Sequence, residues 1–511
     1  MGYIESHLLS VVTFLPLLGA VLVALLPRGE GGQHKGVALL ASLLTFLLSI
    51  PLWTGFRAGP SRYAFEQKTD WAPSLGISYH VGLDGVALLL FLLTTFLGPI
   101  VVLSSWKYIQ ERVKVYCIAL LLLETAMLGT LAALDLVLFY VFWEAMLIPM
   151  YLLIGMWGSE RRIYAAVKFF LFTFIGSVLM LLAIFWLWSN SGRKSFDYLD
   201  LLNAGVVDPG TQRWLFLAFA LAFAIKVPIW PLHTWLPDAH TEAPAAGSII
   251  LAGVMLKMGT FGFIRYAMPL FPQAALAWAP AIAVLGVIGI VYGSLMCMAQ
   301  TDLKRLIAYS SVAHLGFVML GLAALTPEAV SGAVLQMVNH GISTGALFLM
   351  VGYLYERTHT RELSAYGGLA SVTPAIAATF LVITLSSIGL PGTNGFVGEF
   401  LILLGTFTSR VIGGAVPLAV VGATGVILGA VYMLWMYQRV FFGPQRKAAS
   451  HGLADLTVRE WLTVAPLLIA IVAIGFAPQP LLSAMKEPVD AFVSRVSRAD
   501  RMPVRKAEVE R

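Results

Sequence analysis

Charged residues are scarce in this 511-residue chain. Asp, Glu, Lys and Arg together make up 12% of it, whereas ~25% is typical of soluble domains. Apolar residues make up 59%, which is more than a soluble core needs. These proportions exclude an ordinary soluble globular protein, and they make each charge inside an apolar segment informative.

Cysteine is also scarce, since Cys117 and Cys297 are the only two in the sequence and each lies inside an apolar run. Their spacing fits neither a disulfide framework nor the clustered ligands of a zinc or iron–sulfur site. We therefore expect no metal and no cofactor in this chain. The net charge of +6 comes from basic residues in short loops and in the C-terminal tail, a pattern typical of membrane topology rather than of nucleic-acid binding.

Apolar runs of about 20 residues, long enough to cross a hydrocarbon core of ~30 Å, recur along the whole chain. The first run, which ends at Pro27, lacks a basic n-region and a small-residue cleavage site, so we expect it to be a retained span. No segment between the runs is long enough for a soluble domain. The pattern predicts an all-α integral membrane protein with about 14 transmembrane helices, at residues 8–27, 36–55, 82–104, 115–133, 136–157, 164–189, 215–236, 246–268, 278–299, 306–325, 330–354, 373–408, 415–442 and 460–482.

Basic residues are unevenly divided between the two sets of loops, and by the positive-inside rule the richer set faces the cytoplasm. The richer set, after odd-numbered spans, contains Arg28, Lys35, Lys107, Arg112, Lys114, Arg161, Arg162, Lys168, Lys304, Arg305, Arg357, Arg361, Arg439, Arg446, Lys447 and Arg459. The poorer set contains Arg57, Arg62, Lys68, Arg193, Lys194, Arg213, Arg265 and Arg410. An even number of spans then places both termini on the outer, periplasmic side of a bacterial-type inner membrane.

Two of the predicted spans should be interrupted. In the sequence AIKVPIWP, Pro228 and Pro231 lack the N–H groups that a continuous helix requires, so the helix should kink or unwind there. The run 373–408 is too long for one span and contains GLPGTNG, with Pro391, Gly392 and Gly395 near its middle. Broken helices at membrane depth are typical of transport sites, although a single one is more often a structural kink.

Lysine and arginine are nearly excluded from the spans, and the exceptions are Lys226 and Lys257. A charged lysine at mid-membrane costs at least ~2.5 to 3.5 kcal/mol, so it must face a polar interior or lose its proton. We interpret both lysines as proton carriers. The structural alternative is a permanent ion pair that holds two helices together.

Acidic and imidazole side chains inside the spans complete the set of candidate proton-transfer residues. Glu144 is the acid nearest the middle of its span and is the natural partner of Lys226. Glu399 lies in the first turns after the second break, where a helix N-terminus favours an anion. His314 and His340 titrate near neutral pH and suit a relay, or serve as structural hydrogen-bonding groups.

Two further acids receive structural or interface interpretations. Glu124 lies inside a span, and Asp135 lies at a short turn between spans.

Several segments resemble the antiporter-like subunits of respiratory complex I, in the same order along the chain. They are VGLDG at 81–85, FYVFWEAMLIPMYLLIG at 139–155, KVPIWPLHTWLPDAHTEAP at 226–244, LAGVMLKMGTFG at 251–262 and LPGTNGFVGEF at 390–400. The resemblance covers essentially the whole sequence. A glutamate at position 399, where sister subunits carry lysine, points to the M-type branch, called chain 4 in mitochondria.

The resemblance implies a fold of two inverted five-helix repeats, each with one broken helix. The implied segments are an N-terminal three-helix segment at 1–114, repeats at 115–275 and 276–445, and a last span with a charged tail at 446–511. It also implies Glu144 and Lys226 as a coupled pair, Lys257 as the central relay, His314 and His340 along the axis, and Glu399 as the terminal site.

The function implied is proton translocation within NADH:quinone oxidoreductase, without redox chemistry in this chain. Flavin, iron–sulfur clusters and quinone would belong to partner subunits, among them related antiporter-like subunits, and the remaining partners would be lipid, water and protons. The sequence leaves open a cation/proton antiporter subunit, a membrane subunit of a proton-pumping hydrogenase, a structural membrane scaffold and a solute permease.

Overall fold

The computed structural model describes residues 7–27, 29, 31–57, 63–192, 195–205, 207–446 and 453–499. The two ends of the chain, whose sidedness the sequence predicts, lie outside the described residues. So do some of the basic residues used in that prediction, namely Arg28, Arg62, Arg193, Lys194 and Lys447.

In the described residues, 12 helices are long and apolar enough to cross a membrane. They are α2 (Leu8–Leu25), α3 (Gly31–Gly55), α4 (Gly85–Ser104), α5 (Val113–Ala132), the pair α6 (Leu136–Ala145) and α7 (Leu147–Trp157), α8 (Arg162–Ser189), the series from α12 (Ala245–Ile250) to α14 (Met268–Leu270), α15 (Pro272–Met298), α16 (Leu303–Ala324), α17 (Pro327–Thr358), α20 (Ala415–Phe441) and α21 (Val458–Phe476). The predicted total of about 14 spans stays a prediction.

Two more apolar runs form interrupted helices. One consists of α10 (Pro209–Lys226) and α11 (Trp235–Glu242), and the other of α18 (Pro374–Ile388) and α19 (Asn394–Phe407). Each is the fourth helix in a set of five, because α10 follows α5, α6–α7 and α8, while α18 follows α15, α16 and α17. Five crossings bring the chain to the opposite face of a membrane, so the second set starts from the opposite side to the first, as an inverted repeat requires.

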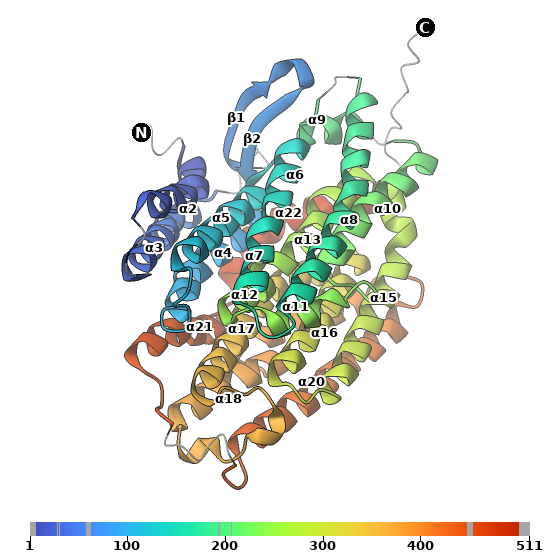
Figure 1. The fold of residues 1–511 in the computed structure, drawn as a ribbon. Helices are drawn as coiled ribbons and strands as arrows, with labels where there is room; N and C mark the ends of the chain where they lie inside the picture. The colour runs from blue at the N-terminus through green and yellow to red at the C-terminus, as the bar shows by residue number, and fades with distance from the viewer. Residues whose placement is uncertain are drawn as a thin grey trace.

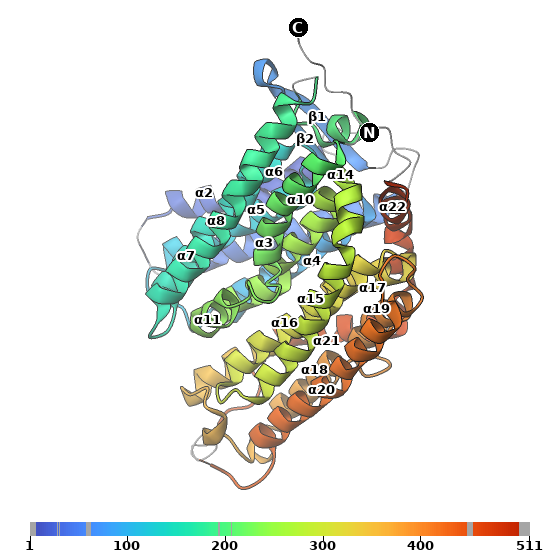
Figure 2. The ribbon, with the colours of Figure 1, turned by 90° about the vertical axis from the view of Figure 1, so that its right-hand side faces the viewer.

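The two sets meet along α17, the 32-residue helix that packs against both. It contacts α12 of the first set and α19 of the second, and in Figure 1 it lies between α12 and α18. In the orthogonal view the teal helix α8 and the orange helix α20 lie on opposite sides of the molecule (Figure 2). Side chains on the buried faces of α17 can therefore contact one half or the other.

The first break begins where the proline-containing segment removes backbone donors. The helix α10 ends at Lys226, and the carbonyl of Ala224, which Pro228 cannot engage, accepts from the N–H of Ile229 at 2.9 Å. The indole of Trp235 donates to the next carbonyl, Ile225 O, at 2.8 Å. Protein groups thus donate hydrogen bonds to the backbone carbonyls that the unwound turn leaves free, as irregular backbone at membrane depth requires.

The second break depends on glycine. The helix α18 ends at Gly389, which has φ +81°, in the left-handed region that glycine tolerates. At Gly395, in the first turn of α19, a Cβ atom would lie 2.2 Å from the carbonyl oxygen of Ser386. Only glycine allows the two half-helices to approach this closely.

Two elements were not predicted from the sequence. An antiparallel hairpin of β1 (Ala64–Ala72) and β2 (Ile77–Leu83) projects from one end of the helices (Figure 1). The segment interpreted as a charged tail contains a helix, α22 (Gln479–Ser497), which buries Met485, Val489 and Phe492 against α4, α15 and α17. Its charged residues Lys486 and Glu487 are exposed, whereas Arg495 donates to the backbone carbonyls of Pro269 and Leu202.

The hairpin is tied to the helices by an ionic cluster whose buried members are His80 and Asp197. His80 of β2 lies 2.6 Å from Asp197, which precedes α9 (Tyr198–Asn203), and 2.9 Å from Glu66. Lys68 of β1 pairs with Asp197 at 2.8 Å. Burial alone would lower the pKa of His80, but the hydrogen bonds and charges of Asp197 and Glu66 raise it above 6.5. Burial would raise the pKa of Asp197, but His80 and Lys68 lower it to about 2.

This cluster predicts a pH-dependent attachment of the hairpin. A histidine whose pKa is raised on folding stabilises the fold fully below its ordinary value of 6.5, and the contribution is lost as pH rises through the raised value. We expect Asp197→Asn to lower the free energy of unfolding by about 1.5–3 kcal/mol at acidic to neutral pH, and by less in alkaline solution. Denaturant unfolding of the detergent-solubilised protein measures this. The control Asp208→Asn, an exposed helix cap, should show no such trend, and a pH-independent effect of Asp197→Asn would refute the attachment.

Candidate functional site

Lys257 lies at the centre of the protein with its side chain 0% exposed. It belongs to α13 (Leu256–Gly262), a short α-helical stretch between two π-helical segments, Leu251–Met255 and Phe263–Ala267. Its amine donates to the carbonyl oxygen of Ala252 and lies 2.6 Å from Nδ1 of His340. A π-helical turn displaces carbonyls from the α-helical ladder, which explains how a backbone oxygen in the same helix is free to bind the lysine.

The two histidines lie next to each other at the boundary between the two sets of helices. His340 of α17 and His314 of α16 have ring centroids 5.6 Å apart. The Nε2 atom of His340 has no hydrogen-bond partner among the described residues. Nδ1 of His314 lies 3.0 Å from Oε1 of Glu399, and its Nε2 lies 3.3 Å from the hydroxyl of Ser387. No hydrogen bond joins the two rings directly.

Glu399 lies beyond His314 and is the last of these ionisable side chains on the side of the second set of helices. It lies in α19, in the second turn after the break, and is 4% exposed. Besides His314, it accepts a hydrogen bond from Nε2 of Gln336 at 3.0 Å. The break itself is held to α17 by Asn339, whose side-chain amide donates to the carbonyl of Asn394 at 2.7 Å. The carboxyl is therefore fixed by two donors and placed by the helix break.

Lys226 lies beside the helix break of the first set, as Glu399 does in the second set, and is the last residue of α10. It is 1% exposed, and its amine has no hydrogen-bond partner among the described residues. It lies 5.1 Å from the ring centre of Trp143 and 5.9 Å from that of Phe169. Cation–π contact of this kind gives a lysine partial compensation for the loss of water.

Glu144 lies beside this lysine but makes no ion pair with it. It is the residue before the end of α6, where Pro149 of the next helix cannot donate to the carbonyl of Ala145. Its carboxyl contacts Ser177 and Tyr140 and is within electrostatic reach of Lys226. One carboxyl oxygen, Oε1, lacks a hydrogen-bond partner among the described residues. The two groups are close enough to influence each other and free enough to separate.

The two lysines stand on helices in close contact. A Cβ atom at Gly259 of α13 would lie 2.6 Å from the carbonyl oxygen of Phe223 in α10, so only glycine permits the approach. No hydrogen bond joins Lys226 to Lys257, because the described partners of the second amine are Ala252 and His340. The structure therefore brings together a row of ionisable side chains, which we call the ionisable row: Glu144, Lys226, Lys257, His340, His314 and Glu399.

The sequence places every lysine and arginine other than Lys226 and Lys257 in loops, span ends or the tail, and the structure buries three of those that lie at span ends. Lys35, Arg265 and Lys304 are also buried within candidate spans. Each lies near a helix end and turns inward: Arg265 pairs with Asp84 at 2.9 Å, and the two lysines donate to backbone carbonyls of neighbouring segments. The positions of these residues near loops did not predict their burial, because the sequence does not show which way a side chain turns.

Two buried histidines beside the first break were missed by the sequence reasoning. His233 precedes α11 and lies 5.1 Å, ring to ring, from Tyr292. His240, within α11, is fully buried and stacks on Phe348 at 4.6 Å. Neither ring nitrogen of His240 has a hydrogen-bond partner among the described residues, and Lys257 lies within its electrostatic reach. The sequence feature that could have identified them is a pair of histidines, seven residues apart, immediately after the proline break.

The acids that received structural interpretations differ in their surroundings. Asp135 caps α6 by accepting from the N–H groups of Val137 and Leu138. Glu124 is buried in α5 against Gly98, where a Cβ atom would lie 2.6 Å from its Oε1. Both cysteines are buried and unpaired.

The ionisable row can exchange protons but cannot supply electrons. Each member is a titratable group enclosed by helices, and chains of Asp, Glu, Lys and His within membrane spans are typical of proton relays. Three joints lack a direct side-chain hydrogen bond among the described residues: between Glu144 and Lys226, between the two lysines, and between the two histidine rings. Proton transfer across them requires water or a change of rotamer.

Known proteins resemble this chain over most of its length. The sequence profile of the family described as NADH:quinone oxidoreductase/Mrp antiporter, TM, matches residues 133–428. NADH-quinone oxidoreductase subunit M of Rhodobacter capsulatus is 47% identical over 93% of this chain and 94% of its own length. The protein of the same name from Rickettsia prowazekii is 42% identical over 95% and 99%. A chain of respiratory complex I from Thermus thermophilus with bound NADH has a TM-score of 0.87 at 34% identity, over 96% of this chain and 99% of that one.

The contacts of Glu399 predict the effect of removing its carboxyl. We expect Glu399→Leu to lower the free energy of unfolding by about 1–3 kcal/mol, because His314 and Gln336 become buried donors without an acceptor. Glu399→Gln should cost less, since its amide oxygen still accepts one of the two bonds. Thermal unfolding in detergent measures both, with Leu404→Ala on the exposed face of the same helix as control. Equal melting temperatures for Glu399→Leu and Glu399→Gln would show that the carboxyl does not satisfy these donors.

Proposed function

Because this chain belongs to the NADH:quinone oxidoreductase/Mrp antiporter transmembrane family, we propose that it moves protons across the bilayer through the ionisable row, as the M-type membrane subunit of NADH:quinone oxidoreductase. The observation that carries the proposal is the contact of Lys257 with His340, 2.6 Å long. This contact links a titratable side chain of the first set of helices, Lys257, directly to one of the second set, His340.

The arrangement favours transport over a purely structural role. A permanently locked lysine would have a carboxylate partner, since an unpaired buried charge is costly. Lys226 instead has aromatic rings beside it and Glu144 at a distance, and Lys257 has a backbone carbonyl and the imidazole of His340. Both amines can gain or lose a proton without breaking an ion pair that holds helices together.

The redox chemistry belongs, in this proposal, to partner subunits that carry the flavin, the iron–sulfur clusters and the quinone. Their reaction would change the charge at one end of the row. Separation of Glu144 from Lys226 would favour release of the lysine proton toward Lys257, because the carboxylate no longer stabilises the ammonium. The proton would then pass through His340 and His314 to Glu399.

The positive-inside rule gives the proposed orientation, with the loops that contain Ser159, Lys304 and Arg361 on the cytoplasmic face. The periplasmic face would then carry the β-hairpin. In this orientation the two ends of the chain lie outside the cytoplasm.

The proposal predicts distinct effects for the charges in the row. In assembled enzyme, Lys226→Ala and Glu144→Ala should sharply lower the number of protons moved per electron, because each removes a group that must take up or release the proton. Proton uptake by inverted vesicles, measured with a pH-sensitive dye during NADH oxidation, tests this. Matched controls are Lys486→Ala and Glu328→Ala, which remove exposed charges of the same kind.

Normal assembly with wild-type proton yield in both row variants would rule the mechanism out. A scaffold role predicts the opposite pattern, with less assembled complex and an unchanged proton yield per electron. A cation/proton antiporter would show proton movement that depends on a cation gradient in the absence of NADH.

A further inference from the structure

A basic cavity lies at the C-terminal end of α20, where the loop between α17 and α18 packs beside it. Its empty volume is about 790 Å³. Its lining combines Trp435, Gln438 and Arg439 of α20 with Arg446 beyond the helix and Tyr366 of the loop. None of the described residues that line it is acidic. The cavity therefore presents uncompensated positive charge to a molecule that enters it.

Backbone contacts hold the two walls of this cavity together. The N–H of Gly368, in the loop, donates to the carbonyl of Phe442 at 3.1 Å. A Cβ atom at Gly367 would lie 2.7 Å from the carbonyl oxygen of Pro444, so only glycine permits this approach. These contacts join segments far apart in the sequence and fix the shape of the cavity.

The two arginines of the cavity have no carboxylate partner among the described residues. The guanidinium of Arg439 lies 4.7 Å from the ring centre of Trp435, and a guanidinium stacked on a ring keeps the N–H groups at its edge available. Arg446 is exposed and uses Nη1 to donate to the carbonyl of Ser364 at 2.9 Å. Guanidinium forks match the oxygens of a phosphate group, so a phosphate or phosphodiester is the ligand chemistry that fits.

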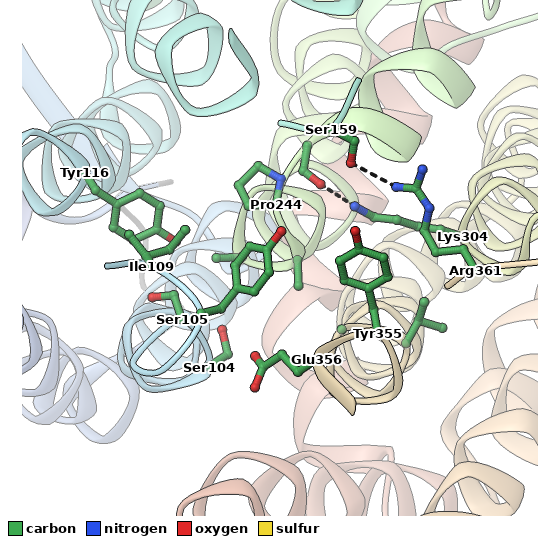
Figure 3. A pocket seen from close by; sticks show the side chains of 16 residues that line it. Ser104, Ser105, Ile109, Tyr116, Ser159, Pro244, Lys304, Tyr355, Glu356 and Arg361 are labelled. Carbon is green, nitrogen blue, oxygen red and sulfur yellow. Dashed lines mark hydrogen bonds between the residues drawn. The ribbon is translucent and has the colours of Figure 1, made fainter. Parts of the chain in front are cut away.

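A second cavity, between α4, α12 and α17, shows the opposite arrangement of charge (Figure 3). Its lysine and arginine are already engaged by protein groups. Lys304 donates to the carbonyl of Ala243, and Arg361 donates to the hydroxyl of Ser159 at 3.2 Å. The carboxyl of Glu356 adds negative charge to its lining. The cavity at the end of α20 is thus the better anion site of the two.

The helix α20 places its cavity at the level of the membrane surface. It is one of the candidate spans and lies at an edge of the bundle (Figure 2). From Ala415 to Gln438 it contains no charged residue, and Arg439 is the first. The intervening helix is about 36 Å long, enough to cross a hydrocarbon core of ~30 Å. Trp435, one turn earlier, has the position of an aromatic residue at the membrane interface.

An exposed apolar stripe leads along α20 to the cavity. Ile427, Val431 and Leu434 are 67%, 50% and 45% exposed. Their spacing of four and three residues places them on one face of the helix, and Gln438, which lines the cavity, continues that face. An amphiphile with a phosphate group would fill the cavity and the stripe together, whereas a soluble phosphate would use the cavity alone.

We propose that this cavity binds the headgroup of an anionic phospholipid, with the acyl chains of the lipid along the stripe. In the proposed orientation the lipid belongs to the cytoplasmic leaflet. Arg439 and Arg446 bind the phosphate oxygens, and Gln438 donates its amide N–H. Basic pockets between transmembrane helices on the cytoplasmic side are typical sites for such headgroups. The inference requires only a membrane-embedded chain and is independent of proton transfer through the ionisable row.

Photo-crosslinking tests the site in the assembled enzyme. Vesicles of a zwitterionic phospholipid contain a small fraction of phosphatidylglycerol or of phosphatidylcholine, each with a diazirine in its acyl chain, and mass spectrometry measures lipid adducts on residues 427–446. We expect more adducts with phosphatidylglycerol. Arg439→Gln and Arg446→Gln should each lower this excess about fivefold, because a basic side chain at the membrane surface contributes about this factor to anionic-lipid binding. Arg439→Lys, which keeps the charge, should retain most of the excess.

Arg410→Gln is the matched control, since Arg410 is an exposed arginine at the other end of α20 and should not affect the excess. If Arg439→Gln assembles poorly, Arg446→Gln, beyond the helix end, decides the matter. Equal adducts from both lipids, no adducts from either, or an excess that survives both glutamine variants would overturn the site. An excess abolished by inorganic phosphate at constant ionic strength would show a soluble anion site and overturn the lipid assignment.

Discussion

A lysine amine at the centre of a membrane has only protein groups and trapped water to solvate it, and a charged one costs at least ~2.5 to 3.5 kcal/mol to place there. In this protein the amine of Lys257 obtains a backbone carbonyl from a π-helical turn and an imidazole from α17. Both depend on the surrounding fold: the π-helical turn displaces the carbonyl, and α17 must run between the two five-helix sets to bring His340 within reach.

The two halves of the ionisable row are built differently, although each ends at a broken helix. In the second half Glu399 accepts from His314 and Gln336 and is held firmly. In the first half Lys226 and Glu144 approach without bonding, and the amine rests against aromatic rings. A loosely held charge pair can be separated by a small motion, whereas a tightly bonded carboxyl provides a stable terminal site. This asymmetry suits a row in which the proton moves toward Glu399.

Much of the fold followed from the sequence because the relevant forces are local. Apolar run length predicts spans, and Pro228 and the GLPGTNG segment remove donors or require positive φ values wherever they occur. The β-hairpin, α22 and the inward-facing Lys35, Arg265 and Lys304 were missed because they depend on tertiary packing. For the site, the residue types Lys, Glu and His inside spans identified the members of the row, but the burial of His240 against Phe348 became visible only from the packing of α11 and α17. The positions of Glu144 and Lys226 in the sequence also could not show that the two side chains form no ion pair.

The central claim is that protons pass from Lys226 to Glu399 through groups joined by water at two gaps, one between the lysines and one between the histidine rings. A structure of the assembled enzyme at a resolution that orders internal water tests it most directly. The account predicts water molecules between the amines of Lys226 and Lys257, and one or more between Nε2 of His340 and His314, each with two or more polar partners. Dry, apolar packing at either gap, in every state trapped during turnover, would contradict it.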